Sequence, residues 1–186
     1  MFETFRKAWK IEDLRKRLLF TLLILVLFRL GCAIPVPYIS AGALTTMFAG
    51  GTGDMLEYLN MMSGGALSEC TLFALGVQPA INASIIMQLL TIAIPKLEEM
   101  QKDGEDGRKK IAAITRYVTV GLALIESIAM SIGFGRQGLL VDYNFVNCAI
   151  VVCTLTAGSA FLMWIGERIT EKGVGNGMSI VLTINI

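Results

Sequence analysis

The chain has 186 residues, of which 54% are hydrophobic and 17% are charged, against about 25% charged in an average soluble domain. It has no histidine and a formal net charge of +1, which argues against a mixed histidine metal site and against a broad basic surface for nucleic acid. The positions of the charges along the chain are therefore more informative than their sum.

Four apolar runs have the length of about 17–25 residues that a membrane-spanning helix requires. We expect these spans at residues 18–34, 72–95, 111–134 and 145–165. Residues 1–17 form a basic, amphipathic segment before the first run. Pro35 and Pro37 follow that run and no small-residue cleavage site does, so we interpret it as a retained span and not as a signal peptide.

Lysine and arginine residues are frequent in some loops between the apolar runs and rare in others, and this distribution predicts the orientation of the chain. They are concentrated before the first run, in the loop 96–110 between the second and third runs, and after the fourth run in 166–176. The opposite side has only Arg29 and Arg136. By the positive-inside rule the N-terminus and both basic loops are expected in the cytoplasm, and the loop 35–71 outside.

The predicted external loop contains a candidate short helix at Asp54–Met62. Asp54 is a plausible N-cap because Glu57 follows three residues later, the spacing of a capping box. Glycines precede and follow the segment and would act as hinges. A helix of this length covers only about 13 Å and cannot span. It is either a short surface helix or a mobile element that dips into a cavity from outside.

The second run, LFALGVQPAINASIIMQLLTIAIP, carries polar groups that lipid cannot satisfy. Pro79 predicts a kink in this helix. Val77 and Ile81 are four residues apart and share a face, next to a stripe formed by Gln78 and Asn82. The pattern is compatible with a helix that lines an aqueous path. It is equally compatible with packing between helices, where amide side chains bond across the interface.

Three further features are weaker signals. Glu126 lies within the third run, and an intramembrane carboxylate is a candidate functional group, although a packing role is as compatible with its position. The glycine-rich GVGNG at Gly173–Gly177 lacks the strand and spacing of a phosphate loop and is interpreted as a turn. The four cysteines have no C-x-x-C spacing, so we expect apolar fillers and no metal or cofactor.

Residues 177–186 begin another apolar helix. Ten residues extend about 15 Å, half of a hydrocarbon core. A helix that ended there would leave carbonyl groups unpaired in lipid. We therefore expect this sequence to be part of a longer protein, interrupted within its fifth span.

Long and irregular motifs make the sequence recognisable. KRLLFTLLILVLFRLGCAIPVP, NMMSGGALS, FALGVQPAINASIIMQLL, DGEDGRKK and FLMWIGERITEKGVGNGMSI, with the spacing between them, closely resemble the N-terminal half of the SecY family. The resemblance covers essentially the whole chain. It implies an all-α, polytopic transmembrane bundle that forms the first five-helix repeat of a ten-helix, inverted-repeat channel.

The resemblance also implies three groups of site residues. A hydrophobic pore ring, usually rich in isoleucine, matches Val77, Ile81, Met178 and Leu182, which all remain apolar and so preserve a constriction that excludes water. A second group matches pore-facing or lateral-gate residues, namely Gln78, Asn82, Ile85, Ile86 and Gln88. A third group matches a plug that closes the external funnel, namely Asp54, Met55, Leu56, Tyr58, Leu59, Met61, Met62, Ser63, Gly64 and Gly65. Glu69 and Glu126 stand where relatives carry a basic residue and a glutamine.

The function that the resemblance implies is a passive channel subunit, not an enzyme. It would conduct unfolded polypeptides across the bacterial plasma membrane and release signal or transmembrane segments sideways into lipid. The implied partners are SecE-type and SecG-type small membrane subunits, a SecA-type motor ATPase, the ribosome, signal-bearing polypeptides and the bilayer, with no direct readout of nucleic acid.

Two other classes of membrane protein fit the sequence less well than a channel does. A secondary transporter of a small solute also uses broken helices, but would place a charged or strongly polar cluster at mid-membrane, where this sequence offers apolar residues. An intramembrane enzyme would need a Ser–His pair, paired aspartates on facing spans or an H-E-x-x-H motif, and the sequence has none of these.

Overall fold

The computed structural model describes residues 11–40, 42, 58, 60, 61 and 63–185. Within these ranges the regular elements are helices, and the extended pairings are two isolated bridges, Pro35 with Thr71 and Ile39 with Leu140. The all-α prediction is confirmed. In chain order the helices are α2 (Glu12–Gly31), α5 (Gln78–Ala93), α6 (Pro95–Lys102), α7 (Gly104–Arg136), α8 (Phe145–Lys172) and α9 (Gly177–Asn185).

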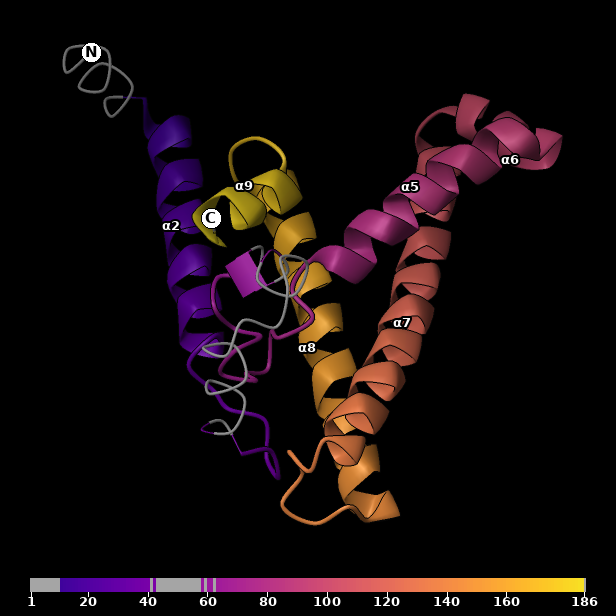
Figure 1. The fold of residues 1–186 in the computed structure, drawn as a ribbon. Coiled ribbons are helices and arrows are strands. Elements are labelled where there is room, and N and C mark those ends of the chain that lie inside the picture. The colour runs from indigo at the N-terminus through magenta and orange to yellow at the C-terminus, as the bar shows by residue number, and fades with distance from the viewer. Residues whose placement is uncertain (1–10, 41, 43–57, 59, 62, 186) are drawn as a thin grey trace.

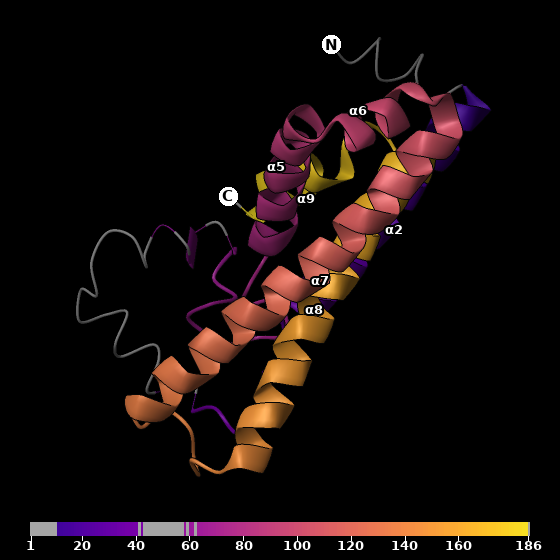
Figure 2. The same ribbon diagram turned by 90° about the vertical axis from the view of Figure 1, so that its right-hand side faces the viewer.

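The two longest helices, α7 and α8, form an antiparallel pair that is closed at one end by residues 137–144 and opens toward the other end (Figure 1). Helix α5 crosses the open end against α7, and α9 packs between α8 and α2. The start of α2, helix α6 and the turn between α8 and α9 all lie at the end opposite to residues 137–144 (Figure 2).

By length and composition, α7 and α8 are long and apolar enough to cross a membrane. The pair α5 and α6, bent by 102°, would make a third, broken span. Helix α2 carries too many charged residues to count as a span in the same way. Basic residues occupy its first turns and Arg29 its last, so its uncharged stretch is limited to residues 18–28. The four-span topology remains a prediction.

The sequence predicts one kinked helix over the second apolar run, and this prediction is wrong. Residues 72–77 form turns, with Gly76 in the left-handed region at φ +59°, and α5 begins only at Gln78. Pro79 therefore lies in the first helical turn, where its missing N–H would have no intrahelical partner in any case. The sharp bend occurs instead at Pro95, which starts α6 after the extended residue Ile94.

The predicted loop 96–110 is also largely helical. Pro95 opens α6, and Gly104, with φ +77°, allows the reversal into α7, which begins seven residues earlier than expected. Glu105 and Asp106 lie in the first turn of α7, where acidic side chains interact favourably with the helix dipole. A Cβ at Gly107 would overlap the carbonyl group of Met100, so this glycine permits α6 to pack on α7.

Two groups of buried side chains form the core. The loop cluster lies where the segment between α2 and α5 and the segment after α7 meet α8, and comprises Val36, Leu67, Cys70, Ala74, Leu139, Leu140, Val151 and Leu155. The central cluster joins α2, α8, α9 and the turns before α5, and comprises Ile24, Phe28, Ala66, Phe73, Val77, Leu162, Ile165, Ile169 and Val181.

Candidate functional site

The four residues matched to a pore ring come together in the structure. Val77 belongs to the central cluster, and Ile81, Met178 and Leu182 pack against it as partly buried side chains. Val77 is only 2% exposed. In this structure the four thus belong to one packed apolar contact, the central cluster, whose buried residues come from α2, α8, α9 and the turns before α5. Their role as a constriction that lines a pore remains a prediction.

The turns before α5 fix the position of Val77. The N–H of Leu72 donates to the carbonyl of Ile34 at 2.9 Å, and Thr71 pairs with Pro35 in an isolated bridge. A Cβ at Gly158 of α8 would overlap the carbonyl oxygen of Leu72, so the glycine lets this backbone pass directly against the helix. These contacts hold the segment before α5 between α2 and α8.

A second set of close contacts positions α9. The N–H of Gly177 donates to the hydroxyl of Thr170 at 2.9 Å, and that hydroxyl donates to the carbonyl of Gly166 at 2.8 Å. A Cβ at Gly166 would lie 2.6 Å from the sulfur of Met178. Small residues on both helices thus allow α9 to fold back on α8, as is common between membrane helices. The predicted turn at Gly173–Gly177 is observed, and α9 begins at Gly177 as expected.

Helix α2 contacts the same region through polar bonds that the sequence did not reveal. The N–H of Val174 donates to the hydroxyl of Thr21 at 3.4 Å, and Arg17 donates to the carbonyl of Gly173 at 3.5 Å. At the other end of α2, Arg29 donates to the carbonyl of Ile184 at 2.6 Å. The sequence does not reveal this partner of Arg29, because it lies 155 residues away in the chain.

The residues matched to a lateral gate lie along α5 with different exposures. Gln78 and Asn82 are half-buried, whereas Gln88 is exposed, as are Ile85 and Ile86 at 50% and 38%. Asn82 and Glu126, which the sequence presents as separate features, approach each other where α5 packs against α7. This proximity agrees with the interpretation in which amide side chains bond across an interface between helices.

The predicted plug is only partly covered. Asp54, Met55, Leu56, Leu59 and Met62 lie outside the described residues. Tyr58, Asn60 and Met61 are helical, and the N–H groups of Gly64 and Gly65 donate to the carbonyls of Met61 and Asn60 at 3.0 and 2.9 Å. Gly64 has φ +66°, so these bonds form a Schellman motif that ends the helix at the predicted glycine pair.

Residues 66–70, which follow the glycine pair, are hydrogen-bonded to the end of this helix, and we call them its anchor. Ser63 is buried, and its hydroxyl donates to Asn60 and accepts from the N–H of Leu67. The side chain of Asn60 accepts from the N–H of Ser68 at 2.9 Å. Cys70 is 1% exposed, and burial raises the pKa of its thiol to about 12. The anchor therefore joins the loop cluster through a neutral, inaccessible thiol.

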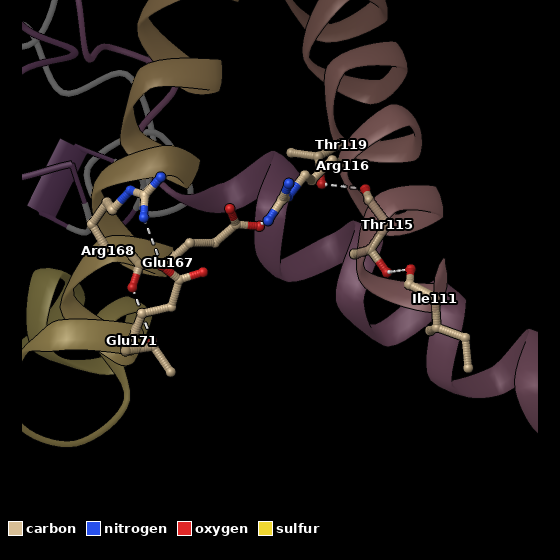
Figure 3. Close-up of polar contacts among 9 residues, drawn as sticks. Ile111, Thr115, Arg116, Thr119, Glu167, Arg168 and Glu171 are labelled. Carbon is tan, nitrogen blue, oxygen red and sulfur yellow. Dashed lines mark hydrogen bonds and ion pairs between the residues drawn. The ribbon is translucent and has the colours of Figure 1, made fainter. Parts of the chain in front are cut away.

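Charged residues connect α7 and α8 at the open end of the pair. Arg116 of α7 forms an ion pair with Glu167 of α8 at 2.7 Å, and Arg168 turns back to Glu171 on its own helix at 2.7 Å (Figure 3). Arg168 also lies 5.6 Å from the centre of the Trp164 ring, a cation–π distance. Within the described part of the chain, no group of three or more potential ligand residues could hold a metal ion.

The fold and the clustered site define a polytopic membrane protein with an all-α bundle, in which broken helical segments meet at an apolar contact. Comparison with known proteins identifies the family. The family model SecY matches residues 71–186. The "Protein translocase subunit SecY" of Pseudomonas aeruginosa is 47% identical over 176 residues, which make up 95% of this chain and 40% of that protein. The chain thus belongs to the SecY family.

Solved structures show the same fold. A structure titled "Sec61 in the Canine ribosome-channel complex from the endoplasmic reticulum" has a TM-score of 0.64 and 20% identity, covering 92% of this chain and 36% of that chain. Another has a TM-score of 0.63 and 20% identity, covering 89% and 34%; its title states that the plug domain of SecY stabilises the closed translocation channel and maintains a membrane seal. The chain spans about two fifths of the length of the curated relatives that it matches.

Proposed function

We propose that this chain provides the first half of a channel that conducts unfolded polypeptides across a membrane and releases signal or transmembrane segments sideways into lipid. Membership of the SecY family supports the proposal. The observation that carries it is the gathering of Val77 and Ile81 with Met178 and Leu182, from segments about 100 residues apart, at one apolar contact. These are the residues that the resemblance assigns to a pore ring.

In the proposed mechanism the packed apolar contact is the sealed state. Apolar side chains that enclose a narrow space exclude water and therefore ions. A passing polypeptide would separate α5 from α9, and the glycine-rich turn before α9 together with the left-handed Gly76 before α5 would absorb the movement. The energy would come from a partner, so the chain would act as a passive conduit and not as an enzyme.

The plug and the lateral gate belong to the same proposal. The segment from Asp54 to Gly65 would close the external side, with the anchor after Gly65 remaining fixed in the loop cluster. The face of α5 that carries Ile85, Ile86 and Gln88 is exposed within this chain, so it offers a surface along which an apolar signal segment could lie beside lipid.

Partners and location follow from the same reading. We propose SecE-type and SecG-type membrane subunits, with a SecA-type motor ATPase and the ribosome acting on the cytoplasmic side. The location would be a bacterial plasma membrane with the N-terminus in the cytoplasm, which agrees with the basic residues of α2 and with the bacterial origin of close relatives.

Photocrosslinking in the full-length protein tests the proposal. A photoreactive amino acid at Ile81 or Met178 should crosslink to a signal-bearing polypeptide arrested during translocation. The same probe at Leu22, which is 62% exposed on α2 and does not belong to the central cluster, is the control and should crosslink far less to the hydrophilic part of the substrate. Equal crosslinking at all three positions, or none at Ile81 and Met178, would contradict a pore at this contact.

A further inference from the structure

A pocket lies on the α7–α8 pair near the end where the two helices meet. Its cavity volume is about 460 Å³, within the usual range for sites that bind small molecules. The ring of Tyr143 forms part of the wall and packs against α7 at Gly135, where a Cβ would overlap it. The walls are almost entirely apolar and include Ile128, Ser131, Tyr143, Phe145, Cys148 and Val152.

One polar group in this wall has no partner. Ser131 is 1% exposed, and within the described part of the chain its hydroxyl oxygen has no hydrogen-bond partner. Other hydroxyls on α7 bond to their own helix, as Thr115 does to Ile111 and Thr119 to Thr115. A buried hydroxyl without a partner is unfavourable because it has lost its hydrogen bonds to water, so a ligand that supplies an acceptor would be favoured.

The pocket also lies at a defined level of the membrane. Between Arg116 and Arg136, α7 has 19 residues, among which Glu126 is the single acidic residue and none is basic. They extend about 28 Å, close to the thickness of a hydrocarbon core. Ser131 is five residues from Arg136, about 7.5 Å along the helix. Tyr143 is 62% exposed near the same boundary, where the amphipathic tyrosine ring favours the interface.

We propose that this pocket binds one glycerophospholipid, with an acyl chain along the apolar walls and the ester carbonyl accepting a hydrogen bond from Ser131. One acyl chain of such a lipid matches the pocket, because it is a long hydrocarbon whose ester carbonyl supplies an acceptor at its polar end, while the phosphate would stay outside the apolar walls. The level of Ser131, close to the membrane boundary, is where an acyl ester is available. The proposal does not depend on polypeptide conduction.

A competition experiment separates a bound lipid from lipid that merely surrounds the protein. The full-length protein, purified with the subunits that it retains, is placed in nanodiscs with a phospholipid carrying a photoreactive acyl chain. Crosslinks are mapped by mass spectrometry to the peptide that contains Cys148. An unlabelled ester phospholipid should compete about fivefold better than its ether-linked analogue, the factor that one hydrogen bond of average net strength provides, because the ether lacks the carbonyl.

Two controls accompany the measurement. Ser131→Ala should remove the preference for the ester lipid, whereas Ser159→Ala should keep it, because Ser159 is a second buried hydroxyl without a partner in the described chain that does not line the pocket. Crosslinks to the exposed face of α2 around Leu22 should be competed equally by both lipids. Equal competition at the pocket in the unaltered protein, or crosslinks there to another polypeptide instead of to lipid, would overturn the proposal.

Discussion

Several single residues determine how closely the segments of this protein approach one another. A Cβ at Gly31 would overlap the ring of Phe73, and one at Gly158 would overlap the backbone of Leu72. Phe73 in turn stacks on Phe28 with ring centres 5.4 Å apart. The sequence shows these glycines but not what they contact, because each partner lies far away in the chain. Their importance follows only from the fold.

Cys70 provides a test at the scale of one residue. In a variant where Cys70 is the only cysteine, the folded protein should be alkylated at pH 9 several hundred-fold more slowly than the unfolded chain, because the folded thiol has a pKa of about 12 and the free thiol about 8.5. Equal alkylation rates in the native and the detergent-unfolded protein would show that Cys70 is accessible to solvent in the folded protein, which would contradict its burial.

The sign of the accompanying stability change follows from the same shift. Above the pKa of the free thiol the unfolded chain loses a proton that folded Cys70 retains, so the free energy of unfolding should fall as pH rises from about 8.5 toward 12. Cys70→Ala should lack this contribution. Thermal unfolding of both proteins at pH 8 and pH 10 measures the difference.

At the scale of elements, apolar length predicted where the helices α7, α8 and α9 lie, because long uninterrupted hydrophobic runs have few alternatives. It failed at residues 72–77, where Gly76 and the contact of Leu72 with α8 outweigh the apolar character of the run. It also failed at 96–110, where polarity suggested a loop although the segment has good helix formers. Pattern alone did not bring Asn82 near Glu126, since their proximity depends on how α5 crosses α7.

The bend between α5 and α6 gives a prediction at this scale. Pro95 disfavours helical geometry at Ile94, which is extended at φ −111° and ψ 110°. Pro95→Ala should let α5 continue into α6. Spin labels at positions 84 and 101, measured by double electron–electron resonance, should then move from a backbone separation of about 16 Å, which the 102° bend gives, toward the roughly 26 Å of a continuous helix.

Pro79→Ala is the matched control for that experiment. Pro79 also lies in a first helical turn, but no second helix precedes it, so the distance between the two labels should not change. If Pro95→Ala leaves the distance at the value of the unaltered protein, the bend is held by the packing of α6 on α7 at Gly107 and not by the proline.

At the scale of the whole molecule, the charged residues and the apolar lengths agree on one placement in the membrane. The ion pair between Arg116 and Glu167 marks one boundary on both long helices. From this level α7 runs to Arg136, and α8 has no charged residue between Phe145 and Gly166. The start of α2, helix α6 and the turn after α8 lie at the end with the ion pair (Figures 1 and 2). From the positive-inside rule we expect that end in the cytoplasm.

Labelling with a thiol reagent that cannot cross the membrane tests this placement. Single cysteines are introduced into the cysteine-free, full-length protein at Gln101 on α6, Val141 between α7 and α8, and Lys172 at the end of α8; all three positions are exposed. In intact bacterial cells only position 141 should react, and after permeabilisation all three should. Labelling of 101 and 172 in place of 141 would reverse the orientation. Helices α7 and α8 have 33 and 28 residues, about 50 and 42 Å, so each is long enough to cross a core of about 30 Å. If both cross, positions 101 and 172 lie on the same side of the membrane. Labelling of these two positions from opposite sides would therefore contradict an antiparallel pair of spans.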